Sequence, residues 1–184
     1  MIEKPTIILV PLGPVPVDLL DFLASALIPI FGISCGIAPT IPIPSAAYDQ
    51  RRGQYEGHRV LTVLSRLDIP HAKRALGLVD ADCYSSGLNF IFGQARIHGR
   101  DAFIALPRLR QSFYGLPEDE ALFQQRALKE AVHELGHTYG LDHCPNPRCV
   151  MHFSNSLLDT DRKGAAFCTR CQTKLGTLMK GNGL

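Results

Sequence analysis

The chain has 184 residues, of which 46% are hydrophobic, and this is sufficient for one compact domain with a substantial core. Its formal net charge is only +2 and its lysines and arginines are scattered, so the composition argues against a nucleic-acid-binding surface. The apolar run at 17–31 is interrupted by Asp18, Asp21 and Pro29, which favours an amphipathic helix over a membrane span.

The cysteine pattern indicates a reducing compartment. Four of the six cysteines have the spacing of metal ligands, whereas Cys35 and Cys83 stand alone. Residues 1–6 lack the basic start and the small-residue cleavage site of a secretion signal. We therefore expect a cytoplasmic protein, with no membrane or nucleic-acid partner. We also expect a monomer.

The first half of the chain is predicted to alternate strands and helices. An apolar run bounded by prolines predicts a buried strand, and apolar residues at helical spacing predict the helix that follows it. Pro39 and Pro42 would confine the second strand to an edge or an irregular stretch. The expected strand, helix, strand, loop and helix cover 6–10, 17–31, 37–43, 45–55 and 57–67.

The second half is predicted to continue with strands and to end in a long helix. His98, Gly99 and Arg100 indicate a hairpin turn between two strands. Pro117 and three acids at 118–120 mark the start of the helix. The three strands and the helix are expected at 75–80, 88–97, 102–106 and about 116–139. This order of mixed elements is typical of an α+β domain.

The sequence from His133 to His143 reads as a catalytic zinc site. His133 and His137 are four residues apart, so on a helix they share one face and can reach one metal ion. Glu134 is the candidate general base, because a carboxylate there can take a proton from the attacking water. Gly140 can end the helix in a left-handed conformation and turn the chain back, so that His143 supplies a third nitrogen.

Four cysteines follow this motif in two pairs. Their spacing suits a closed, tetrahedral four-thiolate site for a structural zinc ion, although two disulfides or unrelated buried thiols are alternatives. In an extended segment, neighbouring side chains point to opposite sides. His143 and the cysteine after it could therefore serve two different zinc ions from one short piece of backbone. The four candidate ligands are Cys144, Cys149, Cys168 and Cys171.

The combined pattern resembles a known family. The run from His133 to His143, with Met151 after it, is the metzincin signature; in that clan a methionine lies in a tight turn beneath the metal. An ordinary core methionine is the alternative for Met151. With Cys144, Cys149 and the later Cys168-Thr-Arg-Cys171, the last third of the chain is similar to the archaemetzincins.

The resemblance implies a fold. We expect one zincin-like α+β domain spanning 1–184, with a twisted mixed β-sheet packed on the active-site helix. Residues 1–140 would form the sheet-and-helix part, and 141–184 a C-terminal lobe that binds zinc. The resemblance also implies that the strand around Phe92–Ala95 is the exposed edge along which an extended substrate lies. Gly93 there would allow close approach of a peptide, or else mark a β-bulge.

The predicted function is zinc-dependent hydrolysis of peptide bonds. The catalytic zinc would be bound by His133, His137 and His143, and a second zinc would be structural, giving two Zn²⁺ ions per chain. The substrate would be a peptide or a protein. The alternative is a zinc-stabilised protein that binds peptides through the same fold with little or no catalysis. The presence of Glu134 and the lack of an obvious fourth ligand favour the peptidase.

Overall fold

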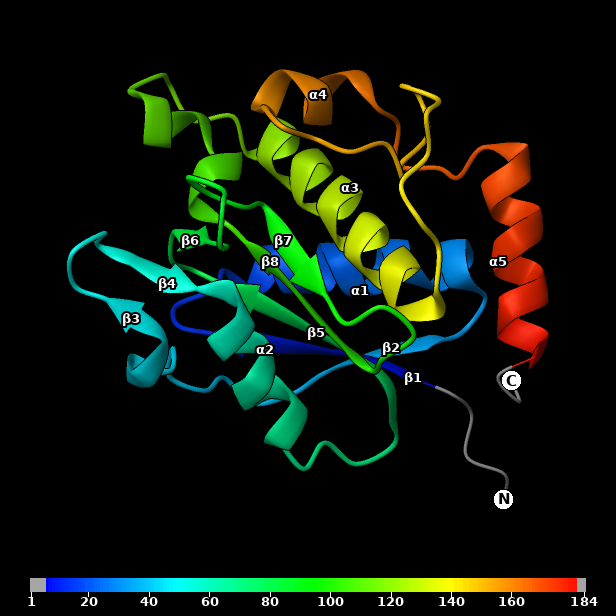
Figure 1. Cartoon of the computed structure of the whole chain (residues 1–184), viewed down its shortest axis with the longest axis horizontal. Helices are drawn as coiled ribbons and strands as arrows, with labels where there is room; N and C mark the ends of the chain where they lie inside the picture. The colour runs from blue at the N-terminus through cyan, green and yellow to red at the C-terminus, as the bar shows by residue number, and fades with distance from the viewer. Residues whose placement is uncertain (1–5, 182–184) are drawn as a thin grey trace.

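The computed structural model describes residues 6–181, so residues 1–5, which entered the argument against a secretion signal, lie outside it. A five-stranded mixed sheet forms the centre of the molecule (Figure 1). The central strands run parallel, and only the last edge strand, β7, is antiparallel to its neighbour. In spatial order the strands are β2 (Ser34–Ile37), β1 (Thr6–Leu12), β5 (Ala72–Val79), β8 (Asp101–Ala105) and β7 (Gly93–Ala95).

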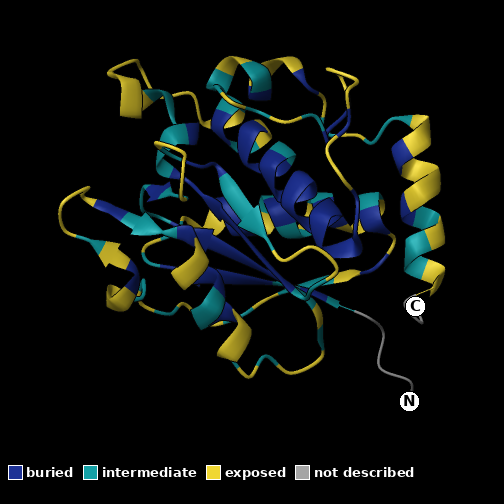
Figure 2. Cartoon of the chain, in the orientation of Figure 1, coloured by how far each residue is buried: buried dark blue, intermediate teal, exposed yellow. Residues whose placement is uncertain are grey.

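Helices cover both faces of this sheet, so its strands are buried on two sides. Helices α1 (Val17–Phe31) and α3 (Glu120–Tyr139) pack together on one face, and α2 (Gly57–Arg66) covers the other. Along β8, alternate side chains point to opposite faces: Ile104 joins the core under α1 and α3, and Phe103 joins the core under α2. Figure 2 accordingly shows the central strands and most of α3 as buried, whereas the edge strand β7 is intermediate.

Two strand predictions were wrong in their extent. The second strand was expected at 37–43, but β2 occupies Ser34–Ile37, and Ile41 makes only an isolated bridge to Leu12. The reason is that Pro39 and Pro42 cannot donate to a β-ladder. The strand expected at 88–97 is reduced to β7, with an isolated bridge at Ile91.

The segment predicted as a loop at 45–55 contains regular structure. It forms a short 3₁₀ helix followed by a hairpin, which pairs with β6 in a second, three-stranded sheet. Sequence analysis also missed two further 3₁₀ turns before α3. The strands are β3 (Tyr48–Asp49), β4 (Gln54–Glu56) and β6 (Cys83–Tyr84), and the 3₁₀ turns are Ser45–Ala47, Pro107–Leu109 and Gln111–Tyr114.

The chain after α3 forms two further helices, α4 (Leu157–Arg162) and α5 (Thr169–Gly181), and both contact α3. Neither helix was predicted. In Figure 1 they lie beside opposite ends of α3, joined by an irregular segment. Across residues 6–181, no helix combines the length and the apolar character that a membrane crossing requires.

The predicted helices at 17–31, 57–67 and 116–139 are confirmed, with small shifts at their ends. Helix α3 begins after Asp119, whose carboxylate accepts a hydrogen bond from the N–H of Leu122 at 2.9 Å. The helix therefore starts after Pro117 and not at about residue 116, where the sequence predicted it. Helix α1 continues past Pro29 to Phe31. The expected mixed sheet against the motif helix is present, because α3 packs on β7 and β8.

The contact between α2 and the sheet can be tested with a glycine substitution. A Cβ atom at Gly77 in β5 would lie 2.7 Å from Cδ1 of Leu64 and 3.0 Å from Cβ of Phe103. We expect Gly77→Ala to lower the free energy of unfolding by about 1–3 kcal/mol, measured by urea denaturation. Gly176→Ala in α5, where a Cβ atom meets nothing within 4 Å, should instead be neutral or stabilising. Equal effects of the two substitutions would contradict this packing.

Candidate functional site

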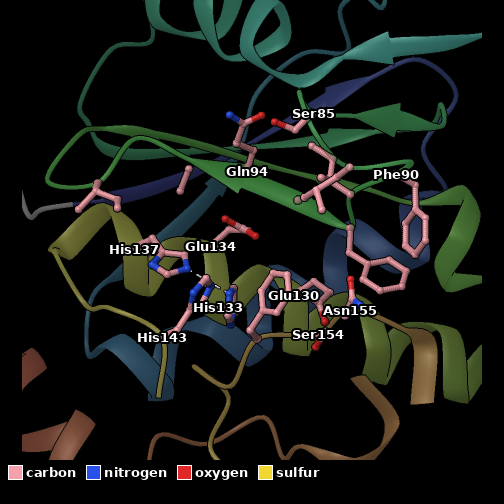
Figure 3. A pocket seen from close by; sticks show the side chains of 17 residues that line it. Ser85, Phe90, Gln94, Glu130, His133, Glu134, His137, His143, Ser154 and Asn155 are labelled. Carbon is pink, nitrogen blue, oxygen red and sulfur yellow. Dashed lines mark hydrogen bonds between the residues drawn. The ribbon is translucent and has the colours of Figure 1, made fainter. Parts of the chain in front are cut away.

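The C-terminal half of α3 presents two histidines and a glutamate to a cleft (Figure 3). His133 and His137 lie one helical turn apart, and their ring centroids are 4.7 Å from each other. Glu134 is next to His133 in sequence and also lines the cleft. All three residues are buried, so the helix fixes their positions.

The turn after α3 brings a third histidine to the same place. Gly140 has φ of 99° and its N–H donates to the carbonyls of Gly136 and His137. This left-handed residue ends the helix and reverses the chain. The ring centroid of His143 consequently lies 5.3 Å from that of His133 and 4.8 Å from that of His137.

Backbone carbonyls set the orientation of the first two rings. Nδ1 of His133 is 2.8 Å from the carbonyl oxygen of Val150, and Nδ1 of His137 is 2.7 Å from that of Leu141. Nδ1 must carry the proton to donate to a carbonyl, so Nε2 of each ring keeps its lone pair. The two Nε2 atoms face each other at 3.1 Å. Two lone pairs at this distance repel each other unless a cation lies between them.

Zinc fits this donor set. Nitrogens bound about 2.0–2.1 Å from one tetrahedral zinc ion would lie roughly 3.3 Å apart, close to the separation seen here. The ligand atoms of His133, His137 and His143 all lie within 4.8 Å of one another. Burial is the main cause that lowers the pKa of each of these imidazoles, which favours the neutral form that binds metals.

Glu134 lies directly under the edge strand β7. A Cβ atom at Gly93 would be 2.6 Å from Cγ of Glu134 and 2.7 Å from the carbonyl oxygen of Phe103. Gly93 is therefore needed for the close approach of the strand to the helix. Burial, and then the like charge of Glu130, raise the pKa of the Glu134 carboxyl well above its usual range. A carboxylate whose pKa is raised is a better proton acceptor.

Met151 packs against the other side of the motif helix. It is fully buried, and a Cβ atom at Gly136 would lie 2.5 Å from its Sδ atom. Val150, which accepts the hydrogen bond from His133, immediately precedes it. Met151 thus lies in a turn that packs on α3 at Gly136, one residue before His137. Gly136 was not singled out from the sequence, because a helical glycine gives no signal until its neighbour is known.

The four cysteines form a second cluster. Their Sγ atoms lie within 4.8 Å of one another, and the Sγ atoms of Cys144 and Cys168 are 3.8 Å apart. None of the six cysteines of the chain is in a disulfide. Sulfurs about 2.3 Å from one tetrahedral zinc would be roughly 3.8 Å apart. The pKa of the Cys168 thiol is lowered to about 7, mainly because it accepts a hydrogen bond from the N–H of Cys171. Burial raises the pKa of the Cys171 thiol.

One short stretch of backbone joins the two clusters. His143 faces the histidine cluster, and the next residue, Cys144, belongs to the cysteine cluster. The N–H of Cys144 donates to the carbonyl of Met151 at 2.9 Å. The carbonyl of Cys144 is 3.0 Å from Nδ1 of His152. The segment that carries the third histidine is therefore held against the segment that carries the methionine.

Sequence analysis missed a buried ion pair next to the cleft. Nζ of Lys163 lies 3.1 Å from Oε1 of Glu130, and both residues are almost completely buried. The hydroxyl of Thr160 donates to the same oxygen at 2.8 Å. Glu130 lies one helical turn before Glu134 on α3, a spacing that could have revealed it. Nothing in the sequence marks Lys163 as its partner.

The cleft itself has a volume of about 260 Å³. It is bounded by the start of β7 on one side, by α3 below, and by the segment at 153–155 on the other side. Phe90, Phe92 and Phe153 contribute aromatic surface, whereas Glu130, Ser154 and Asn155 contribute polar groups. The cleft extends beyond His133, away from the third histidine (Figure 3).

Comparison with known proteins places the chain in one family. The model of Peptidase family M54 matches residues 40–177. An archaemetzincin from Pyrococcus furiosus is 49% identical over 175 residues, covering 92% of this chain and 91% of that protein. An archaemetzincin from Methanocaldococcus jannaschii is 44% identical over 165 residues, covering 90% and 89%.

Solved structures agree as well. The crystal structure of archaemetzincin from Methanopyrus kandleri superposes with a TM-score of 0.84 at 38% identity, covering 97% of each chain. A zinc-dependent peptidase from Methanocorpusculum labreanum gives a TM-score of 0.82 at 28% identity, covering 92% of this chain and 99% of that one. The non-catalytic alternative gains no support from these relatives. The family model, the identity to these relatives and the shared fold agree, so the chain belongs to Peptidase family M54, the archaemetzincins, and is a zinc metallopeptidase.

Proposed function

We propose that this chain hydrolyses peptide bonds in the cleft above α3, with His133, His137 and His143 as ligands of a catalytic zinc and Glu134 as the general base. The observation that carries the proposal is the pair of Nε2 atoms that face each other at 3.1 Å beside the Glu134 carboxylate. Zinc bound there would polarise the scissile carbonyl and acidify the attacking water.

Glu134 performs the proton transfers. Its carboxylate takes a proton from the attacking water and then delivers that proton to the amine that leaves. The raised pKa of this buried carboxyl suits both roles, because the group must gain and lose a proton within one reaction cycle. Gly93 keeps the strand close above Glu134, so the carboxylate has few alternative positions.

The outer edge of β7 aligns the peptide substrate. The carbonyl of Phe92 accepts a hydrogen bond from β8 at 2.8 Å, and the N–H of Arg96 donates to β8 at 3.0 Å. Because strand residues alternate in direction, Gly93 and Ala95 point their N–H and C=O groups away from β8. An extended peptide can pair with these groups, which would place its backbone over the histidines.

We further propose a second, structural zinc bound by Cys144, Cys149, Cys168 and Cys171, giving two Zn²⁺ ions per chain. In this arrangement residues 141–184 form a lobe that depends on metal, and 1–140 form the part with the sheet and the motif helix. The absence of disulfides among the six cysteines supports a reducing, cytoplasmic setting. A monomer is consistent with a cleft built from one chain.

The role of Glu134 can be tested by Glu134→Gln. This variant removes the proton acceptor at nearly constant size, so we expect peptide hydrolysis to fall by more than about 100-fold while zinc content stays unchanged. Glu120→Gln, an exposed position in the first turn of the same helix, is the matched control and should keep wild-type activity. Unchanged turnover in the Glu134 variant would exclude it as the general base.

The two metal sites can be separated by counting zinc. We expect two zinc ions per wild-type chain by mass spectrometry of the untagged protein, and one in both His137→Ala and Cys149→Ala. Only the Cys149 variant should also show a large drop in melting temperature, because structural zinc contributes to folding. Cys35→Ala, outside both clusters, should keep both ions. Loss of both ions in His137→Ala, which leaves all four cysteines in place, would contradict two separate sites.

The close approach of β7 to the helix can be tested by Gly93→Ala. The added methyl would have to displace the Glu134 side chain or the strand, since both neighbours are nearer than 3 Å. We expect kcat/KM to fall by about 10-fold or more, with both zinc ions retained. Normal activity would show that the strand can move away from Glu134 without consequence.

A further inference from the structure

We propose that the part of the cleft beyond His133 is a specificity subsite for a large aromatic side chain that ends in a neutral hydrogen-bond donor, of which tyrosine is the standard example. The inference rests on the proposed peptidase function and adds the side chain that the cleft selects. It follows from the walls of this pocket, from the polar groups at its floor and from the balance of charge there.

The walls of the subsite are aromatic. The rings of Phe90 and Phe92 meet edge to face with centroids 5.2 Å apart, at the start of the edge strand. On the opposite side, Phe153 is 45% exposed, and its ring lies 5.0 Å from that of His143. Aromatic walls of this kind stabilise a flat apolar ring between them.

The floor of the subsite is polar. Thr160 and Lys163 both contact Oε1 of Glu130, and the Glu130 side chain lines the cleft. The hydroxyl oxygen of Ser154 is buried and has no hydrogen-bond partner. Figure 3 shows Glu130, Ser154 and Asn155 close together, on the far side of His133 from His143. A buried hydroxyl without a partner costs free energy, which a ligand with the right polar atom would recover.

The charge at the floor favours a neutral donor over a cation. Lys163 is fully buried and already neutralises Glu130. A lysine or arginine side chain of a substrate would bring a second positive charge next to Lys163. A phenol hydroxyl fits better, because it can donate to the Glu130 carboxylate and accept from the hydroxyl of Ser154.

The direction of β7 determines which residue of a bound peptide enters the subsite. Gly93 lies over Glu134, and His98, further along the chain, donates its N–H to the carbonyl of His137 at 3.3 Å. The strand therefore runs from the Phe92 end of the cleft towards the end of α3. A peptide antiparallel to β7 would run the opposite way, so the residue just after the cleaved bond reaches the subsite.

The test uses blocked hexapeptides of sequence Ala-Ala-Ala-Xaa-Ala-Ala, in which Xaa is tyrosine, phenylalanine or lysine. With the zinc-loaded enzyme, we expect cleavage immediately before tyrosine. The value of kcat/KM for the tyrosine peptide should be at least roughly tenfold above that for the phenylalanine peptide, and its ratio to the value for the lysine peptide should be larger still. Equal rates for tyrosine and phenylalanine, or a preference for lysine, would overturn the subsite.

Ser154→Ala tests whether the Ser154 hydroxyl produces the preference for tyrosine over phenylalanine. It removes the unpartnered hydroxyl without disturbing the Glu130–Lys163 pair, so the ratio of the tyrosine rate to the phenylalanine rate should fall several-fold. Ser65→Ala, at an exposed position in α2, is the matched control and should keep the wild-type ratio. A Ser154 variant that retains the full preference would overturn the role of this hydroxyl.

A binding experiment separates the subsite from the peptidase function. In zinc-loaded Glu134→Gln, calorimetry should give a dissociation constant for the tyrosine peptide about tenfold below that for the phenylalanine peptide. If wild type cleaves none of the peptides but this difference in binding is present, the proposed function fails and the subsite stands. If the peptides are cleaved but bind equally, the subsite fails and the peptidase stands.

Discussion

The reversal of the chain at Gly140 is the constraint on which the site depends. Two histidines one turn apart on a helix can bind a metal only weakly, and the third must come from a segment that leaves the helix and returns at once. The positive φ of Gly140 permits that return. The ring of His98 packs against its Cα, where a side chain would collide. Position 140 therefore requires glycine for two reasons: its backbone conformation and the lack of space for a side chain.

The second constraint is that both clusters share one backbone. His143 and Cys144 are adjacent, and their segment is bonded to the one that carries Met151 and Val150. The proposed structural zinc would thus fix the third histidine, the methionine turn and the carbonyl that orients His133. This coupling explains how a segment of short helices and irregular chain can hold catalytic groups in place without a sheet of its own.

Close contacts and buried charge shape the cleft between these parts. Gly93 and Gly136 let the strand above and the methionine below approach α3 at van der Waals distance. The buried pair of Glu130 and Lys163 then places a carboxylate, beside Ser154 and Asn155, at the floor of a pocket with aromatic walls. A buried ion pair is seldom a source of net stability, and the proposed subsite would give this pair a role in recognising a substrate.

The sequence by itself determined the candidate ligands and most of the central elements. Local rules were enough for these: helical spacing defined α3 and its histidines, the glycine defined its end, and paired cysteines defined the second cluster. The tertiary structure decided the extent of β2 and β7, the presence of α4 and α5, and the partners of Gly93, Gly136 and Glu130. Those features depend on contacts between residues far apart in the chain, such as Glu130 with Lys163, and no local pattern encodes them.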